Sequence, residues 1–176
     1  TTLIDLICGL LKPNKGKIIL NKKINLTKIK GTIPIKIGYV PQDIFLLNDS
    51  LQANIAFGLP INEKDQNKII NVMKLCKLEK FIKNKKSIAK ININEDSNNL
   101  SGGEKQRIAI ARAIYPDPEL LIFDEFTSSL DDKTERDILK NLKKILKNKT
   151  AIFISHKKRS LANCKKIYTF KNKTLI

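Results

Sequence analysis

Short apolar runs alternate with longer stretches of helical periodicity along this chain of 176 residues. The runs at 37–40, 120–123 and 151–154 predict buried strands, because a strand that is covered on both faces does not alternate apolar with polar residues. Apolar residues spaced three and four positions apart predict helices over 64–81, around 108–114 and over 138–146. A hairpin is expected around 15–20. The pattern therefore predicts an α/β fold.

The segment Ser101-Gly102-Gly103-Glu104 predicts a helix start that carries chemistry. Ser101 is a favourable N-cap, and Glu104 three residues later completes a capping box. Gly102 and Gly103 would each weaken the helix by roughly 1 kcal/mol relative to alanine. Bare backbone at this point is typical of a site that an anion approaches, because free N–H groups and the positive end of the helix dipole face it. The alternative is a plain capped helix.

Polar side chains follow each of the three predicted strands. Asp124 and Glu125 end one run, Gln42 follows another, and His156, the single histidine of the chain, follows the third. The carboxyl ends of parallel strands share one edge of a sheet, where α/β proteins bind ligands, so we expect these four side chains at a common rim. Taken singly, each has a simpler explanation. An acidic pair is a common strand exit, and a lone histidine after a strand is more often a surface residue.

Two of these segments together resemble the ATP-binding subunits of ABC transporters. The segment 100–107, which reads Leu-Ser-Gly-Gly-Glu-Lys-Gln-Arg, is similar to the signature motif, and 120–125, which reads Leu-Leu-Ile-Phe-Asp-Glu, is similar to Walker B. The resemblance extends over the whole chain. It implies a P-loop NTPase that uses ATP and Mg²⁺, with a RecA-like core at 1–42 and 116–176 and an inserted helical subdomain at 43–115.

The resemblance also implies roles for the residues at the strand ends. Asp124 would help to hold Mg²⁺, and Glu125 would be the general base that polarises the attacking water. Gln42 matches the Q-loop, which reaches the metal and the lytic water, and His156 matches the switch histidine, which contacts the γ-phosphate. In a head-to-tail dimer of two ATP-binding domains, nucleotide contacts are implied for the signature segment and the D-loop: Ser101, Gly102, Gly103 and Asp131. As bare sequence, 128–131 is only a Ser/Asp-rich turn, with Asp131 and Asp132 suited to the first turn of a helix.

The first residues of the chain look like the helix that follows a P-loop. Thr1 would then occupy the Ser/Thr position that binds Mg²⁺, and Thr1 and Thr2 would contact the nucleotide. The first strand and the glycine-rich loop with its lysine would lie upstream and are missing here. We therefore expect this fragment alone to be inactive, and an inert truncated product is one of the alternatives.

Residues 43–58, which follow Gln42, look like the corresponding segment of ABC exporters. Within 94–97, Glu95 resembles the coupling residue of an exporter loop, although a simple acidic loop is an alternative. These features imply ATP hydrolysis that powers export, with transmembrane domains, fused or separate, as partners and a location at the cytoplasmic side of the cell membrane. The rival hypothesis is a soluble, non-transport ABC ATPase that acts on nucleic acid or ribosomes.

Composition adds three constraints. No run approaches the roughly 18 apolar residues of a membrane-spanning helix. The net charge of +17 suggests polyanion binding, but 34 basic residues include only four Arg, and the lysines are scattered with little aromatic interleaving, so we expect no specific nucleic acid as a partner. Cys8, Cys76 and Cys164 lack metal-site spacing, which argues for reduced thiols.

Overall fold

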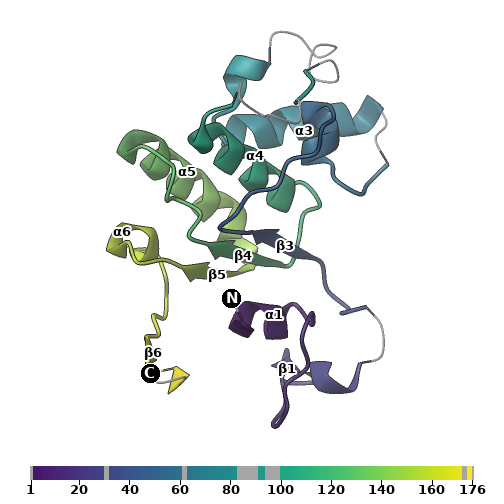
Figure 1. Cartoon of the computed structure of the whole chain (residues 1–176), viewed down its shortest axis with the longest axis vertical. Coiled ribbons are helices and arrows are strands. Elements are labelled where there is room, and N and C mark those ends of the chain that lie inside the picture. The colour runs from purple at the N-terminus through teal and green to yellow at the C-terminus, as the bar shows by residue number, and fades with distance from the viewer. Residues whose placement is uncertain are drawn as a thin grey trace.

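A three-stranded parallel sheet forms the centre of the computed structural model, which describes residues 2–29, 32–60, 63–82, 91–93, 100–171 and 174–175. Its order is β3 (Ile37–Val40), β4 (Leu120–Asp124) and β5 (Thr150–Ile154). The register pairs Val40 with Phe123 and Asp124 with Ile154. The three predicted strands and the α/β fold are confirmed. The carboxyl ends of all three strands lie at one edge of the sheet (Figure 1).

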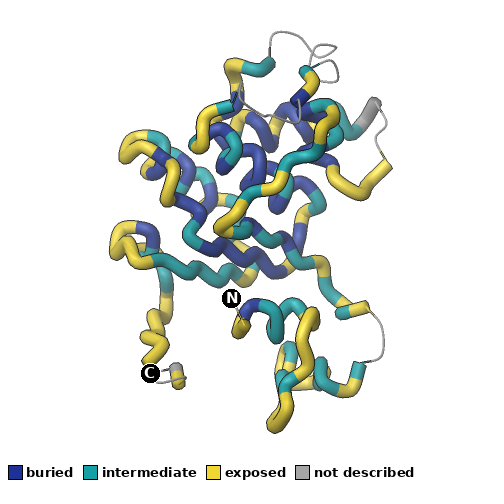
Figure 2. Tube along the Cα trace, viewed as in Figure 1, coloured by how far each residue is buried: buried dark blue, intermediate teal, exposed yellow. Residues whose placement is uncertain are grey.

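The two faces of the sheet are covered by different helices. Leu121 and Phe123 of β4 belong to the larger apolar core, together with residues of α4 (Gly102–Ile114) and α5 (Asp132–Ile145). Leu120 and Ile122 point the opposite way and pack with Ile4 of α1 (Thr2–Ile7). Figure 1 shows α4 and α5 on one side of the sheet and α1 on the other. In Figure 2 the buried residues run from the sheet into the helices above it.

Two further helices pack on α4 rather than on the sheet. They are α2 (Leu51–Ile55) and α3 (Glu63–Leu75). The helix predicted over 64–81 is correct only in its first part, because α3 ends in a Schellman motif. Lys77 has a left-handed φ of 58°, Lys77 N–H bonds the Lys74 carbonyl, and Leu78 N–H bonds the Met73 carbonyl. A separate 3-10 turn, η2 (Glu79–Phe81), follows.

Smaller elements lie at the periphery. The hairpin expected around 15–20 lies slightly later in the chain, as β1 (Ile19–Leu20) and β2 (Ile24–Asn25), followed by η1 (Leu26–Lys28). After α5 come η4 (Leu146–Asn148), α6 (Lys158–Leu161) and the antiparallel pair β6 (Phe170–Lys171) and β7 (Thr174–Leu175). In the part of the chain that the structure describes, no helix has both the length and the apolar character needed to cross a membrane. The subdomain boundaries after residues 42 and 115 stay a prediction.

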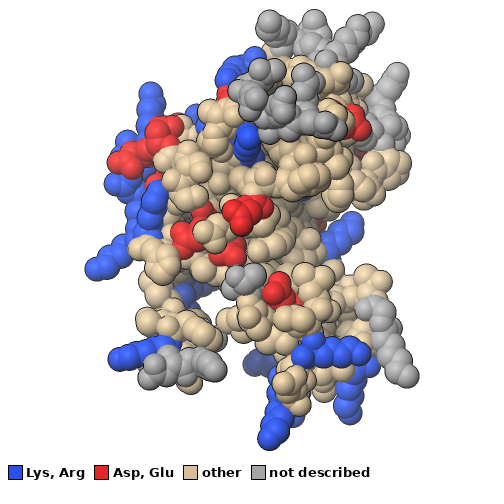
Figure 3. Space-filling model, in the orientation of Figure 1, with Lys and Arg blue, Asp and Glu red and all other residues tan. Residues whose placement is uncertain are grey.

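Basic side chains do not gather into one surface on the visible face. Figure 3 shows Lys and Arg spread around the outline of the molecule, and Asp and Glu both near its centre and beside basic side chains at its left edge. Nucleic-acid binding needs cations that follow a phosphate backbone. The distribution on this face is therefore that of solvated side chains.

Candidate active site

Asp124 ends the central strand, and its side chain is buried at the carboxyl edge of the sheet. The residue is 7% exposed. The Tyr39 hydroxyl, on the neighbouring strand β3, donates a hydrogen bond to Asp124 Oδ2 at 3.4 Å. Burial and the adjacent Asp124 carboxylate raise the pKa of Tyr39, so the phenol stays protonated and keeps its proton for this contact. One oxygen of Asp124 thus has a long hydrogen bond within the protein, which leaves the carboxylate able to accept further ligands.

Glu125 turns away from β4 in a conformation that few non-glycine residues adopt. Its φ is 49°, and its N–H donates to the Ile154 carbonyl oxygen at 3.0 Å. This turn carries the Glu125 carboxylate to the end of β5, where the backbone N–H of His156 donates to Glu125 Oε1 at 3.2 Å. His156 Nε2 lies 3.8 Å from the same oxygen. The Glu125 side chain is 20% exposed, and that of His156 is fully exposed.

The other predicted functional residues are Gln42, the fourth residue expected at this rim, and Thr1, Thr2 and Glu95, which are predicted for nucleotide, metal or coupling roles. Gln42 lies two residues beyond the end of β3, and it is exposed to solvent. Thr2 is the first residue of α1 and is also exposed. Thr1 and Glu95 lie outside the described residues. The structure therefore brings together Asp124, Glu125 and His156, with Gln42 at the same edge of the sheet.

The predicted capping box at the signature helix is present. Glu104 N–H donates to Ser101 Oγ at 3.3 Å, and Ser101 N–H donates to Glu104 Oε2 at 2.7 Å. Glu104 is 4% exposed. Its other oxygen, Oε1, pairs with the ammonium of Lys80 on η2. The start of α4 is therefore attached to the turn that follows α3.

Close packing explains why residue 103 is a glycine, an explanation that the sequence did not suggest. A Cβ at this position would lie 3.0 Å from the Ser129 carbonyl oxygen, whereas a Cβ at Gly102 would make only ordinary contacts. Gly103 therefore allows the loop after Glu125 to approach α4, in addition to any role near an anion. Gly102 has no such packing requirement.

Asp131 is the N-cap of α5, one position before the first turn that we predicted for it. Its carboxylate accepts hydrogen bonds from Lys133 N–H at 3.1 Å and Thr134 N–H at 3.0 Å. The Thr134 hydrogen bonds lower the pKa of Asp131. This is a structural role that leaves its predicted nucleotide contact untested.

Arg112 is a structural residue that the sequence analysis missed. Its guanidinium donates to the Asn54 carbonyl oxygen, to Asn54 Oδ1 and to the Phe45 carbonyl oxygen, each at 2.8 Å. Asn54 is fully buried and also exchanges hydrogen bonds with the backbone of Leu47. Arg112 thereby holds the exporter-like segment against α4. The sequence pattern did not predict this role, because a single arginine among the apolar residues of a helix usually faces solvent.

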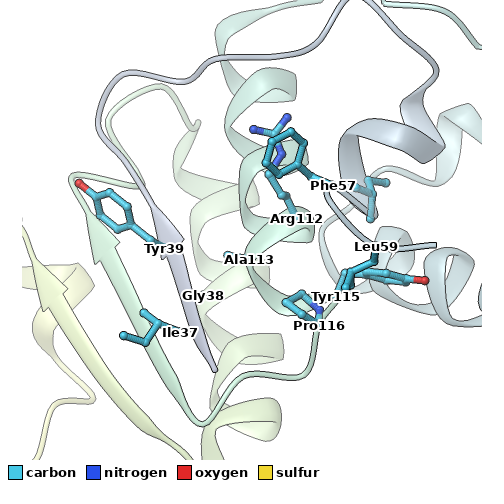
Figure 4. Close-up of a pocket in the computed structure, with 10 residues that line it drawn as sticks. Ile37, Gly38, Tyr39, Phe57, Leu59, Arg112, Ala113, Tyr115 and Pro116 are labelled. Carbon is cyan, nitrogen blue, oxygen red and sulfur yellow. The ribbon is translucent and has the colours of Figure 1, made fainter. Parts of the chain in front are cut away.

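Beside Arg112 lies a cavity of about 220 Å³ between β3, α4 and the segment after α2 (Figure 4). The Phe57 ring lies over the guanidinium, with 5.4 Å between the Arg112 Cζ and the ring centroid. Phe57 is 57% exposed and Phe45 is 72% exposed. The lining is mostly apolar: Ile37, Gly38, Tyr39, Ile55, Phe57, Leu59, Arg112, Ala113, Tyr115 and Pro116.

Comparison with known proteins gives consistent matches. The family model described as ABC transporter matches residues 1–128. The chain is 30% identical to an ATP-dependent lipid A-core flippase of Ralstonia nicotianae, over 100% of this chain and 30% of the flippase. It is 34% identical to the mitochondrial iron-sulfur clusters transporter ATM1 of Kluyveromyces lactis, over 98% of this chain and 24% of the transporter.

A solved structure is similar as well. A bacterial Atm1-family ABC exporter with ATP bound superposes with a TM-score of 0.79 at 30% identity, covering 92% of this chain and 28% of the exporter. The chain thus spans less than a third of the length of each of these proteins.

Proposed function

This chain belongs to the ABC transporter family, and we propose that it binds and hydrolyses ATP to power export across a membrane. The observation that carries the proposal is the convergence of Asp124, Glu125 and His156 at the carboxyl edge of the sheet. Export is favoured over a soluble ATPase because the similar proteins described above are a flippase, an iron-sulfur clusters transporter and an ABC exporter.

Glu125 is the proposed general base. Its carboxylate is partly shielded and held by the His156 N–H, so it can accept a proton from water without reorienting. The exposed His156 imidazole, close to Glu125, is free to meet a phosphate at the open rim. Gln42, on the strand end beside Asp124, is the proposed ligand that orients the attacking water.

Asp124 has the character that a Mg²⁺ ligand needs. Mg²⁺ prefers oxygen ligands and is commonly bound by one or two carboxylates together with substrate phosphates and water. Among the described residues, no group of three or more His, Cys, Asp or Glu side chains is placed to hold a metal ion. When bound, the ion would neutralise charge that develops on the transferred phosphoryl group. We propose Asp124, Gln42 and Thr1 as its protein contacts.

The signature segment is proposed to act on the nucleotide of a second ATP-binding domain. Ser101, Gly102 and Gly103 form the start of α4, where backbone N–H groups and the helix dipole favour an anion. Packing of Gly103 against Ser129 places this segment beside the loop that ends at Asp131. A head-to-tail dimer would therefore use both elements of one domain at the ATP site of the other.

The segment held by Arg112 is proposed to receive the transmembrane domains. Phe45 and Phe57 of this segment are exposed, and Phe57 lines an apolar cavity. Exposed apolar side chains of this kind favour a protein contact. We propose Glu95 as a further coupling residue, on the resemblance alone. The proposed location is the cytoplasmic side of a membrane, through those domains.

The test is ATP hydrolysis by the intact protein, with Glu125→Gln as the diagnostic variant. Loss of the base should lower turnover by about 10²- to 10⁴-fold while ATP still binds. The control is Glu119→Gln, which removes an exposed carboxylate just before the opposite end of β4 and should leave turnover within about twofold. Near-normal turnover in Glu125→Gln would show that Glu125 is not the base.

A further inference from the structure

A buried polar network lies behind the rim that carries Glu125 and His156. At its centre is Glu135 of α5, a carboxylate that is only 1% exposed. The Ser160 hydroxyl donates to Glu135 Oε1 at 2.9 Å, and Ser160 Oγ lies 3.0 Å from Thr127 Oγ1. Thr127 and Ser160 are each 2% exposed. The network therefore joins the loop after β4, helix α5 and helix α6.

Lys157 completes the network from its more exposed side. Its Nζ donates to the Thr127 carbonyl oxygen at 2.9 Å and lies 3.9 Å from Glu135 Oε2. A buried carboxylate is unfavourable unless a charge or hydrogen bonds compensate it, and here both are present. Removal of the carboxylate would leave the Ser160 hydroxyl and the Lys157 ammonium without this partner.

The position of the network relative to the active-site rim is informative. Thr127 lies two residues after Glu125, and Lys157 directly follows His156. The direct contact from His156 N–H to Glu125 Oε1 joins the same two segments. Glu135 thus holds, from the buried side, the two loops whose exposed side presents the proposed base and the histidine.

We propose that Glu135 is a positioning residue for ATP hydrolysis, which acts through Thr127 and Lys157 to hold the Glu125 carboxylate beside His156. This inference rests on the proposed function. Glu135 itself, at 1% exposed, is shielded from bound nucleotide. Its loss should therefore affect the chemical step rather than ATP binding.

The test compares Glu135→Gln with the unaltered intact protein. Glutamine keeps the volume and can still accept from Ser160, but it removes the charge that faces Lys157. Because small displacements of a catalytic group can cost up to about 10²-fold, kcat per ATP-binding site should fall by about 10- to 100-fold while KM for ATP stays within about twofold. The matched control is Asp137→Asn on the same helix, which removes an exposed carboxylate paired with Lys77 and should leave kcat unchanged.

Two further measurements separate positioning from a merely structural role. Turnover is divided by the number of ATP sites found by titration, so that a variant that folds poorly loses sites but not kcat per site. Thr127→Val, which removes only the hydroxyl, should lower kcat per site as Glu135→Gln does, and Thr127→Ser should retain it.

The outcomes are distinct. An active protein whose Glu135→Gln and Thr127→Val variants keep normal kcat per site would overturn this inference alone. An intact protein without ATPase activity would overturn the proposed function, and this inference with it.

Discussion

Gly38 on β3 lies against the backbone of Ala113 on α4, so closely that a Cβ at position 38 would be 2.3 Å from the Ala113 carbonyl oxygen. The neighbours are backbone and buried side chains, which cannot move aside at low cost. This contact allows α4 to pack directly on the strand that leads to Gln42.

Gly38→Ala should therefore destabilise the protein. Overpacking of a core usually costs about 1–3 kcal/mol, and a clash with backbone belongs at the upper end of that range. The measurement is the thermal midpoint of the intact protein. Gly102→Ala is the control, because its Cβ would meet Ser129 at 3.5 Å or more and alanine favours a helix. Equal thermal midpoints for Gly38→Ala and the unaltered protein would show that β3 and α4 can move apart to accommodate the added methyl group without loss of stability.

Arg112→Met should loosen the segment from Phe45 to Asn54. The change removes three hydrogen bonds at 2.8 Å while keeping much of the side-chain volume, and bonds to a charged group are each worth about 1.5–3 kcal/mol. Amide hydrogen exchange in peptides that cover 45–54 should accelerate by at least about tenfold.

The control for this prediction is Arg136→Met, an exposed arginine on α5, which should leave exchange in 45–54 unchanged. Unchanged exchange in Arg112→Met would mean that Asn54 alone holds the segment.

Ser101→Arg tests whether the signature segment works across a dimer. The substitution places a bulky side chain at the start of α4 and should abolish ATP-driven dimerisation. The ATP affinity of the monomer should stay within about twofold, because in the proposed dimer this segment contacts the nucleotide of the other subunit. Sedimentation with and without ATP measures the first quantity, and nucleotide titration measures the second.

Loss of the N-cap alone costs about 1 kcal/mol and needs its own control. Ser50→Arg removes an equivalent cap from α2, where Ser50 Oγ accepts from Ala53 N–H at 3.1 Å, and it should still dimerise. A large loss of monomer affinity in Ser101→Arg would place the segment at its own nucleotide site.

Asp117→Asn should reduce stability at neutral pH but not in acid. A side-chain hydrogen bond from Lys149, 2.7 Å long, holds the pKa of Asp117 below its usual 3.8. A carboxylate with a lowered folded-state pKa stabilises the fold above its unfolded pKa, and this contribution is lost as the pH falls through the folded value.

The difference in thermal midpoint between Asp117→Asn and the unaltered protein should therefore shrink as the pH is taken below 3.8. It should also shrink with added salt, because the Asp117 side chain is 74% exposed. Asparagine is the suitable replacement, since it tolerates the φ of 54° found here. A difference in thermal midpoint that persists in acid would mean that backbone strain at position 117, and not loss of the Asp117 charge, destabilises the variant.

The sequence was informative where local pattern decides structure. The apolar run at 120–123 predicted β4 because a strand covered on both faces has few polar residues, and Ser101 and Glu104 predicted their own capping box because its partners lie three residues apart. The shared rim of Asp124, Glu125 and His156 followed from parallel strands, which the register confirms.

Contacts between distant residues were beyond sequence reasoning. Arg112 and Asn54 are 58 positions apart, and nothing in the helical pattern of α4 shows that the Arg112 guanidinium meets a loop. The hydrogen bond from Ser160 to Glu135 likewise joins residues 25 positions apart, and the close approach at Gly38 depends on how α4 crosses β3. Such features depend on the three-dimensional packing of elements rather than on their individual patterns.

The two oxygens of Glu104 have different partners, since Oε2 accepts from Ser101 N–H and Oε1 pairs with the Lys80 ammonium. A glutamine at position 104 could still accept the hydrogen bond from Ser101 N–H through its amide oxygen. Its NH₂ group would then face the Lys80 ammonium. A cation at position 80 is therefore favourable only while position 104 is acidic. Across related chains, the residues at these two positions should be inherited as a matched pair, with a glutamine at 104 accompanied by an uncharged or acidic residue at 80.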